Sequence, residues 1–105
     1  MARIYACVAD LMLASRVVES LKSSGHEVTA GAKLPAEGGA GFDLIVCDLD
    51  GADPGELAAL SPPAIGFYSH VDVETRQKAL EAGVDLVVPR SRMSRELPDL
   101  VAGMT

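Results

Sequence analysis

Residues 42–51 decide the fold of this chain, and they read Phe42-Asp43-Leu44-Ile45-Val46-Cys47-Asp48-Leu49-Asp50-Gly51. The apolar run in this stretch has the length and the β-branched content of a strand that is buried on both faces, which we expect over residues 43–48. The strand ends on the carboxylate of Asp48. Because open α/β sheets place their chemistry at the carboxyl ends of their strands, Asp48 is the first candidate for a functional residue.

Apolar runs of strand length alternate with helical patterns on both sides of this stretch. The spacing of the apolar residues predicts an amphipathic helix over residues 11–24. The alternation is typical of βαβ units and predicts a single doubly wound α/β domain with a five-stranded parallel sheet in the order 2-1-3-4-5. The other four strands are expected over residues 3–8, 26–32, 64–69 and 85–89.

The remaining connections are less regular. Three glycines and a proline within residues 34–41 favour a loop or a single turn where a second helix would stand. Residues 54–60 are expected to form a short helix before the Ser-Pro-Pro stop at 61–63.

Two helices complete the expected pattern. Asp72 is expected to cap a helix over residues 73–82. Ser94 is expected to cap the last helix, which would place Pro98 in the first turn of that helix, where a missing N–H costs least.

Composition narrows the function classes. The 105 residues are expected to form one domain, 1–105, and a hydrophobic content of 49% argues against a disordered tail. A net charge of −6 argues against nucleic acid as a partner, because such binding depends on Lys and Arg to neutralise phosphates. An acidic surface suits protein partners instead.

The cysteines and the apolar segments bear on location. Cys7 and Cys47 lie in expected strands without metal-ligand spacing, so we interpret them as reduced core thiols. No apolar segment has the roughly 18 residues of a membrane span, and no leader precedes the first strand. These features predict a cytoplasmic protein without a membrane partner.

Three stretches carry a resemblance to a known family: Arg3-Ile4, residues 43–48, and Ala79-Leu80-Glu81-Ala82-Gly83-Val84-Asp85. With them the chain resembles a response-regulator receiver domain over essentially its whole length. The resemblance implies a flavodoxin-like fold and a non-enzymatic role in two-component signal transduction or a phosphorelay. Receivers take a phosphoryl group on the aspartate of their third strand. They hold Mg²⁺ with that aspartate, an acidic pair after the first strand, and a carbonyl two residues past the acceptor.

Some positions match this pattern. The resemblance implies that Asp48 is the phosphoacceptor position and that Asp50 supplies the carbonyl. Ser69 matches the hydroxyl residue that ends the fourth strand. His70 beside it is expected to be a loop histidine, since no third orienting group accompanies it.

Other positions depart from the pattern. Val8 and Ala9 stand where the acidic pair would be, and Asp10 follows one residue later. Arg90 stands where receivers have a lysine, and it cannot reproduce the geometry of an ammonium group. We therefore expect a degenerate receiver, or pseudo-receiver, that works by phosphorylation-independent contact with another protein.

Two alternatives remain open. One is a receiver switched by Mg²⁺-dependent phosphorylation of Asp48, with Asp10, Asp48 and Asp50 as weak metal ligands and with Ser69 and Arg90 as switch residues. The other is a small Rossmann-like enzyme acting on a nucleotide or metabolite, against which the lack of a glycine-rich phosphate loop counts. Asp48 could also be a structural carboxylate at a strand end. No cofactor other than Mg²⁺ is expected.

Three of the six arginines, Arg90, Arg92 and Arg95, gather near the start of the last helix. One interpretation is a solvated loop whose arginines pair with carboxylates such as Asp50 or Asp72. The other is a contact for an acidic partner or an anion. The expected partner is a histidine kinase or a downstream signalling protein, with homodimerisation possible, and the expected contact surface covers residues 75–100.

Overall fold

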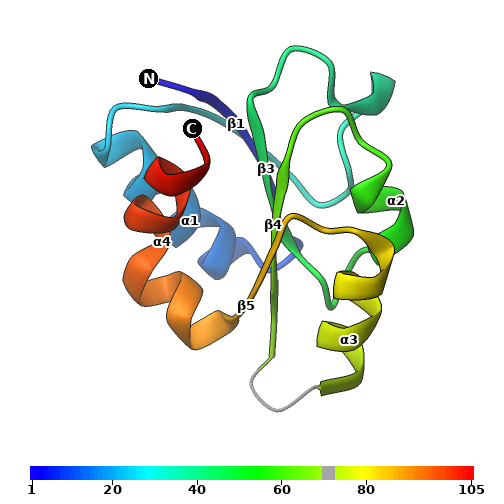
Figure 1. The fold of residues 1–105 in the computed structure, drawn as a ribbon. Helices are drawn as coiled ribbons and strands as arrows, with labels where there is room; N and C mark the ends of the chain where they lie inside the picture. Colours follow the sequence, from blue (N-terminus) through cyan, green and yellow to red (C-terminus); the bar gives the residue numbers. More distant parts are fainter. Residues whose placement is uncertain (70–72) are drawn as a thin grey trace.

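The computed structural model describes residues 1–69 and 73–105, and it confirms the expected sheet. Five parallel strands lie in the order β2-β1-β3-β4-β5 (Figure 1). The strand bounds are Arg3–Cys7 for β1, Glu27–Gly31 for β2, Leu44–Asp48 for β3, Ala64–Tyr68 for β4 and Leu86–Pro89 for β5. Each strand lies within one or two residues of the range expected from the sequence.

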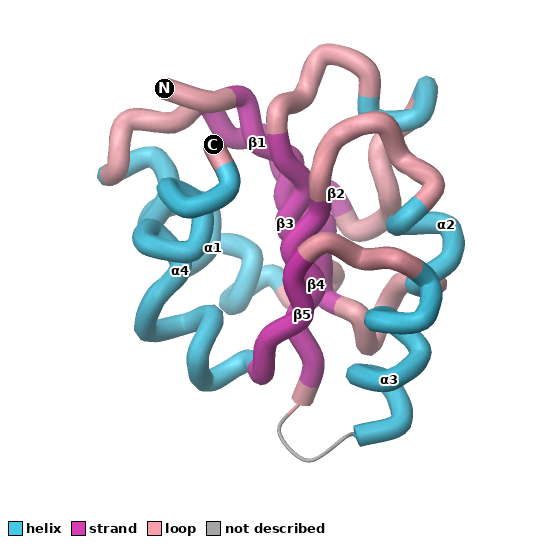
Figure 2. The backbone as a smooth tube through the Cα atoms, in the orientation of Figure 1, coloured by secondary structure: helices cyan, strands magenta, loops and turns pink. Residues whose placement is uncertain are grey.

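Helices cover both faces of the sheet in the three-layer arrangement that Figure 2 shows. α1 (Leu11–Ser23) and α4 (Arg90–Met104) lie on one face, and α2 (Pro54–Ala58) and α3 (Val73–Ala82) lie on the other. Between β2 and β3 there is only a 3-10 turn, Glu37–Gly39, as the glycine-rich sequence indicated. No helix in the described ranges is long and apolar enough to cross a membrane.

The core has two parts because side chains along a strand alternate between the two faces of the sheet. One cluster packs beneath α1 and α4 and includes Ile4, Val46 and Phe67. The other packs beneath α2 and α3 and includes Cys7 and Cys47. The interpretation of both cysteines as buried free thiols is confirmed.

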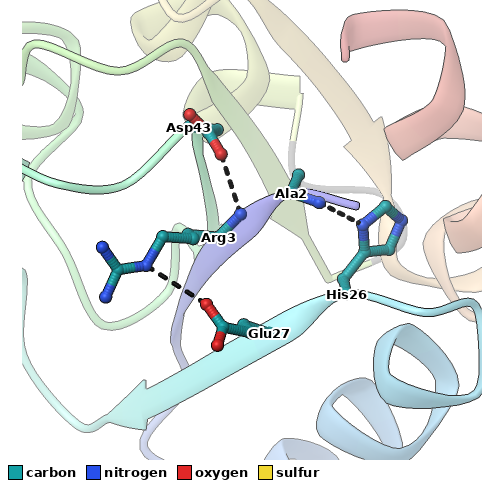
Figure 3. Close-up of polar contacts among 5 residues, drawn as sticks. All are labelled: Ala2, Arg3, His26, Glu27 and Asp43. Atoms are coloured by element: carbon teal, nitrogen blue, oxygen red, sulfur yellow. Dashed lines mark hydrogen bonds and ion pairs between the residues drawn. The ribbon is translucent and has the colours of Figure 1, made fainter.

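Polar contacts hold the amino ends of the first three strands together, as Figure 3 shows. The Asp43 carboxylate accepts a hydrogen bond from the Arg3 N–H at 2.9 Å, which joins β3 to β1. His26 Nδ1 accepts a hydrogen bond from the Ala2 N–H at 3.0 Å, and Arg3 pairs with Glu27 at 3.3 Å. These contacts lie at the opposite edge of the sheet from Asp48.

The contact made by Asp43 recurs between β5 and β4. The Asp85 carboxylate accepts a hydrogen bond from the Ala64 N–H at 2.8 Å. Each aspartate stands one residue before its own strand and binds the first residue of the neighbouring strand. The amino edge of the sheet is therefore stabilised by carboxylates at two strand pairs.

The expected start of the last helix is wrong. α4 begins at Arg90, directly after β5, and Ser94 lies inside it without a capping role. Met93 is only 1% exposed and extends the buried stripe of Leu97 and Leu100 by one turn. Burial of Met93 therefore stabilises a helix that starts before Ser94. Pro98 consequently lies in the helix interior. The expected cap Asp72 lies outside the described residues, as does His70.

Candidate functional site

Asp48 is the last residue of β3 and is half-buried at the carboxyl edge of the sheet. Its Oδ1 accepts a hydrogen bond from the Asp50 N–H at 3.0 Å. Burial raises the pKa of the Asp48 carboxyl above its ordinary value, and the hydrogen bond from Asp50 opposes that rise. The charges of Asp50 and Asp10 raise this pKa further, whereas the charge of Arg90 lowers it. Asp10, Asp50 and Arg90 are therefore each close enough to Asp48 to interact with it electrostatically.

Ser69 is engaged with Asp50 and not with Asp48. It follows β4, and its hydroxyl donates a hydrogen bond to the Asp50 carboxylate at 2.5 Å. A hydroxyl held in this way would have to leave Asp50 before it could bind an oxygen of a group attached to Asp48. The structure thus places Asp48, Asp50 and Ser69 together at the carboxyl edge of the sheet. It adds a Ser69–Asp50 contact that the sequence did not indicate.

Asp10 caps a helix. It stands immediately before α1, and its Oδ1 accepts hydrogen bonds from the Met12 and Leu13 N–H groups, both at 3.0 Å. An aspartate that precedes an apolar helical pattern is itself an N-cap signal, so the sequence could have revealed this role. Before Asp10, the side chain of Val8 packs in the core at 3% exposure, and the exposed Ala9 carries no polar group.

The donor set around Asp48 does not fit a metal site of the expected kind. Within residues 1–69 and 73–105, no group of three or more His, Cys, Asp or Glu side chains could hold a metal ion. The Asp10 carboxylate is directed at the amides of α1, and the Asp50 carboxylate accepts from Ser69. Metal binding by Asp10, Asp48 and Asp50 therefore stays a prediction without geometric support.

The three clustered arginines lie in the first turns of α4 and not in a loop. Arg92 and Arg95 both approach Glu96, at 3.6 and 3.9 Å, so their carboxylate partner lies in their own helix and is not Asp50. The i,i+4 spacing of Arg92 and Glu96 was a sequence signal for this pair. Arg90 is exposed and instead influences Asp48.

Ser69 and Arg90 line an open depression beside the carboxyl ends of β4 and β5, together with Ser91 and Ser94. The depression is shallow and open to solvent, unlike the enclosed pockets that bind most small molecules. It therefore offers little support for a metabolite enzyme.

Three of the solved structures that match nearly the whole chain are receiver domains. The receiver domain of the Francisella response regulator 1452 has a TM-score of 0.79 and 17% sequence identity, and the match covers 99% of this chain and 96% of that one. The non-phosphorylated HemR receiver domain from Leptospira biflexa has a TM-score of 0.79 and 19% identity, with 99% of this chain and 94% of that one covered. The BeF3-activated DrrB receiver domain has a TM-score of 0.80 and 19% identity, with 99% of this chain and 97% of that one covered.

The chain has the receiver fold. The fold predicted from the sequence is thereby confirmed, including the strand order and the reduced second helix. No protein-family model and no curated protein matches the chain. The chain shares its backbone architecture with these receiver domains. In this chain, Asp48 stands at the end of the third strand of that architecture.

Proposed function

We propose that this domain is a receiver-like signalling module that acts by contact with a protein partner and does not depend on phosphorylation of Asp48. The observation that carries the proposal is the segment after β1. Val8 is packed in the core, Ala9 has no polar side chain, and the Asp10 carboxylate caps α1. Phosphoryl transfer relies on metal ions to neutralise charge, and this segment provides no acidic pair to hold one.

Two neighbours of Asp48 add support. Ser69 donates its hydroxyl to Asp50, so in this conformation the Ser69 hydroxyl is not available to Asp48. Arg90 supplies a permanent positive charge that already lowers the pKa of Asp48 without any bound metal. Both contacts exist without a phosphoryl group or a metal ion, which supports a role that depends on neither.

The proposed contact surface is the face around the edge strand β5, between α3 and α4 (Figure 1). On α3, the side chains of Val73 and Leu80 are 69% and 42% exposed. On α4, Arg92 and Arg95 are exposed near the start of the helix. Exposed apolar residues and exposed arginines are both found at many protein interfaces. A histidine kinase or a downstream signalling protein is the proposed kind of partner.

One observation favours a second candidate function, a phosphorylation switch. The charges of Asp10 and Asp50 both raise the pKa of Asp48, which means that two carboxylates repel the carboxylate of Asp48 at this edge. A divalent cation would relieve that repulsion. In this alternative Asp48 is the phosphoacceptor, Asp10 and Asp50 assist Mg²⁺ binding, and Ser69 and Arg90 act as the switch residues.

The test is an NMR titration of isotope-labelled protein with Mg²⁺ and then with beryllofluoride. The amides of Asp48, Ser69 and Arg90 report on the site, and an Asp48→Asn variant is the control for specific binding. We expect no saturable shift at these amides in the wild-type protein. Saturable shifts that disappear in the Asp48→Asn variant and spread to α3 and β5 would refute the proposal and establish the switch.

A gain-of-function variant sharpens this test. Ala9 is exposed, so Ala9→Asp restores one carboxylate after β1 without disturbing the core. If the missing carboxylate is the reason for weak metal binding, this variant will bind Mg²⁺ more tightly than the wild type does. Ala36→Asp, which adds the same charge at an exposed loop position before the Glu37–Gly39 turn, is the matched control. Equal Mg²⁺ affinity in both variants would refute the explanation.

A further inference from the structure

The only two cysteines of the chain lie side by side at the carboxyl edge of the sheet. Cys7 is the last residue of β1, Cys47 is the penultimate residue of β3, and the two are paired in the parallel register of these strands. Neighbouring strands lie about 4.8 Å apart, which falls within the Cα separation that disulfides span. Both side chains belong to the cluster beneath α2 and α3, so they point to the same face.

The two thiols also interact chemically. The Cys47 thiol can donate a hydrogen bond to a Cys7 thiolate, and this lowers the pKa of the Cys7 thiol, while burial opposes the effect. The same hydrogen bond and burial raise the pKa of Cys47. Cys7 is therefore the thiol that more readily becomes a thiolate, which is the nucleophilic form. Cys47 is the neighbour that remains protonated.

The position of the pair connects it to the candidate site. Cys47 directly precedes Asp48, and Cys7 directly precedes the segment in which Val8 packs and Asp10 caps α1. A covalent link at this point would join the ends of the two strands beneath Asp48. Nothing in the proposed contact function uses either thiol.

We propose that Cys7 and Cys47 are a modification site at which a peroxide forms an intramolecular disulfide. The Cys7 thiolate attacks one peroxide oxygen, the O–O bond breaks, and Cys7 sulfenic acid and hydroxide result. The sulfur of Cys47 then attacks the sulfenic sulfur, the S–O bond breaks, and the proton of Cys47 leaves with the hydroxyl group as water. The hydroxide takes up the proton that Cys7 released, so in total two thiols and one hydrogen peroxide give one disulfide and two waters.

Burial sets the expected rate. Cys7 and Cys47 are 2% and 0% exposed, so a peroxide reaches them only through local opening of the structure. We expect oxidation to be slow in the folded protein. We also expect reaction within one chain to outcompete reaction between chains, because each buried thiol has the other as its nearest thiol.

The test treats the full 105-residue chain with hydrogen peroxide, followed by unfolding, alkylation of free thiols and intact mass measurement. We expect a monomer that is lighter by two hydrogen atoms, takes up no alkylating reagent, yields a Cys7–Cys47 peptide, and returns to the starting mass with a reductant. Cys7→Ser and Cys47→Ser variants are the matched controls, and neither should form this species.

Three results would overturn the proposal: two alkylatable thiols after treatment, addition of oxygen atoms without a disulfide, or disulfide-linked dimers as the main product. A second readout tests the position of the bond. The amides of Val8 and Asp48 should shift on oxidation, whereas the amide of Met104 at the far end of α4 should not. Unchanged amides at Val8 and Asp48 would refute the link between this bond and the site. These tests do not depend on the proposed contact function, so the two proposals can fail separately.

Discussion

The capping role of Asp10 leads to a prediction that separates a structural carboxylate from a metal ligand. The Asp10→Ala variant removes the acceptor of two amide hydrogen bonds, from Met12 and Leu13, each 3.0 Å long. The first turn of α1 contains no other acidic residue that could replace it. Loss of an N-cap of this kind costs about 1 kcal/mol of folding free energy.

The magnitude can be expressed as a melting temperature. At an unfolding entropy of about 2.1 cal/mol/K per residue, a loss of about 1 kcal/mol lowers the Tm of a domain of 105 residues by about 4 to 5 °C. Asp10→Asn keeps the oxygen acceptor and removes the charge. It should therefore lose only the dipole interaction at the helix start, a few tenths of a kcal/mol in an exposed position.

Urea unfolding followed by circular dichroism, together with thermal melts, measures both variants against the wild type. The expected order of stability is wild type, then Asp10→Asn, then Asp10→Ala. The capping argument is wrong if Asp10→Ala unfolds at the wild-type urea concentration. It is also wrong if Asp10→Asn loses as much as Asp10→Ala, because the charge and not the hydrogen bonds would then account for the effect.

Three further predictions concern other parts of the sheet. Gly66→Ala would place a Cβ 2.9 to 3.0 Å from three side-chain atoms of Leu49, so we expect urea unfolding to show a loss of about 1 to 3 kcal/mol in the free energy of unfolding. Adding Leu49→Ala in a double variant should restore part of that loss. An unchanged free energy of unfolding in Gly66→Ala would contradict this packing. Because folding raises the pKa of Asp48, the stability that this residue contributes is present below its unfolded pKa near 4 and is lost as pH rises through its folded pKa. Asp48→Asn should therefore be more stable than the wild type at pH 7 and should lose that advantage towards pH 3. An advantage that does not change with pH would exclude this explanation. Asp43→Ala should lower the free energy of unfolding by about 1 kcal/mol because the Arg3 N–H loses its acceptor, whereas Asp43→Asn should lower it less. Equal losses in the two variants would rule out the hydrogen bond as the cause.

Much of the fold could be predicted because it depends on patterns that the sequence carries locally. The apolar run that ends at Asp48 and the alternation around it define five strands, and short right-handed crossovers leave few possible strand orders. The start of α4 could not be predicted in the same way. Ser94 has the local chemistry of a cap, but burial of Met93 against the sheet extends the helix past it. Tertiary packing thus overrode a local signal.

The candidate site shows the same division. Asp48, Ser69 and Arg90 could be placed together because parallel strands bring their carboxyl ends to one edge. The hydrogen bond between Ser69 and Asp50 could not be predicted, since it depends on side-chain rotamers at two strand ends. The sequence signal at Asp10 favoured capping, and the resemblance to receivers drew attention to metal binding instead.

The paired aspartates at the amino edge have a practical consequence for engineering this domain. Asp43 and Asp85 each fix the first residue of a neighbouring strand. A slip of one residue would carry each carboxylate about 3.3 Å from its amide and turn the strand's apolar side chains to the wrong face. Strand alignment is therefore held at the edge opposite Asp48. Carboxylates can be introduced around Asp48 one at a time, and their effects on ion binding can be compared on an unchanged scaffold.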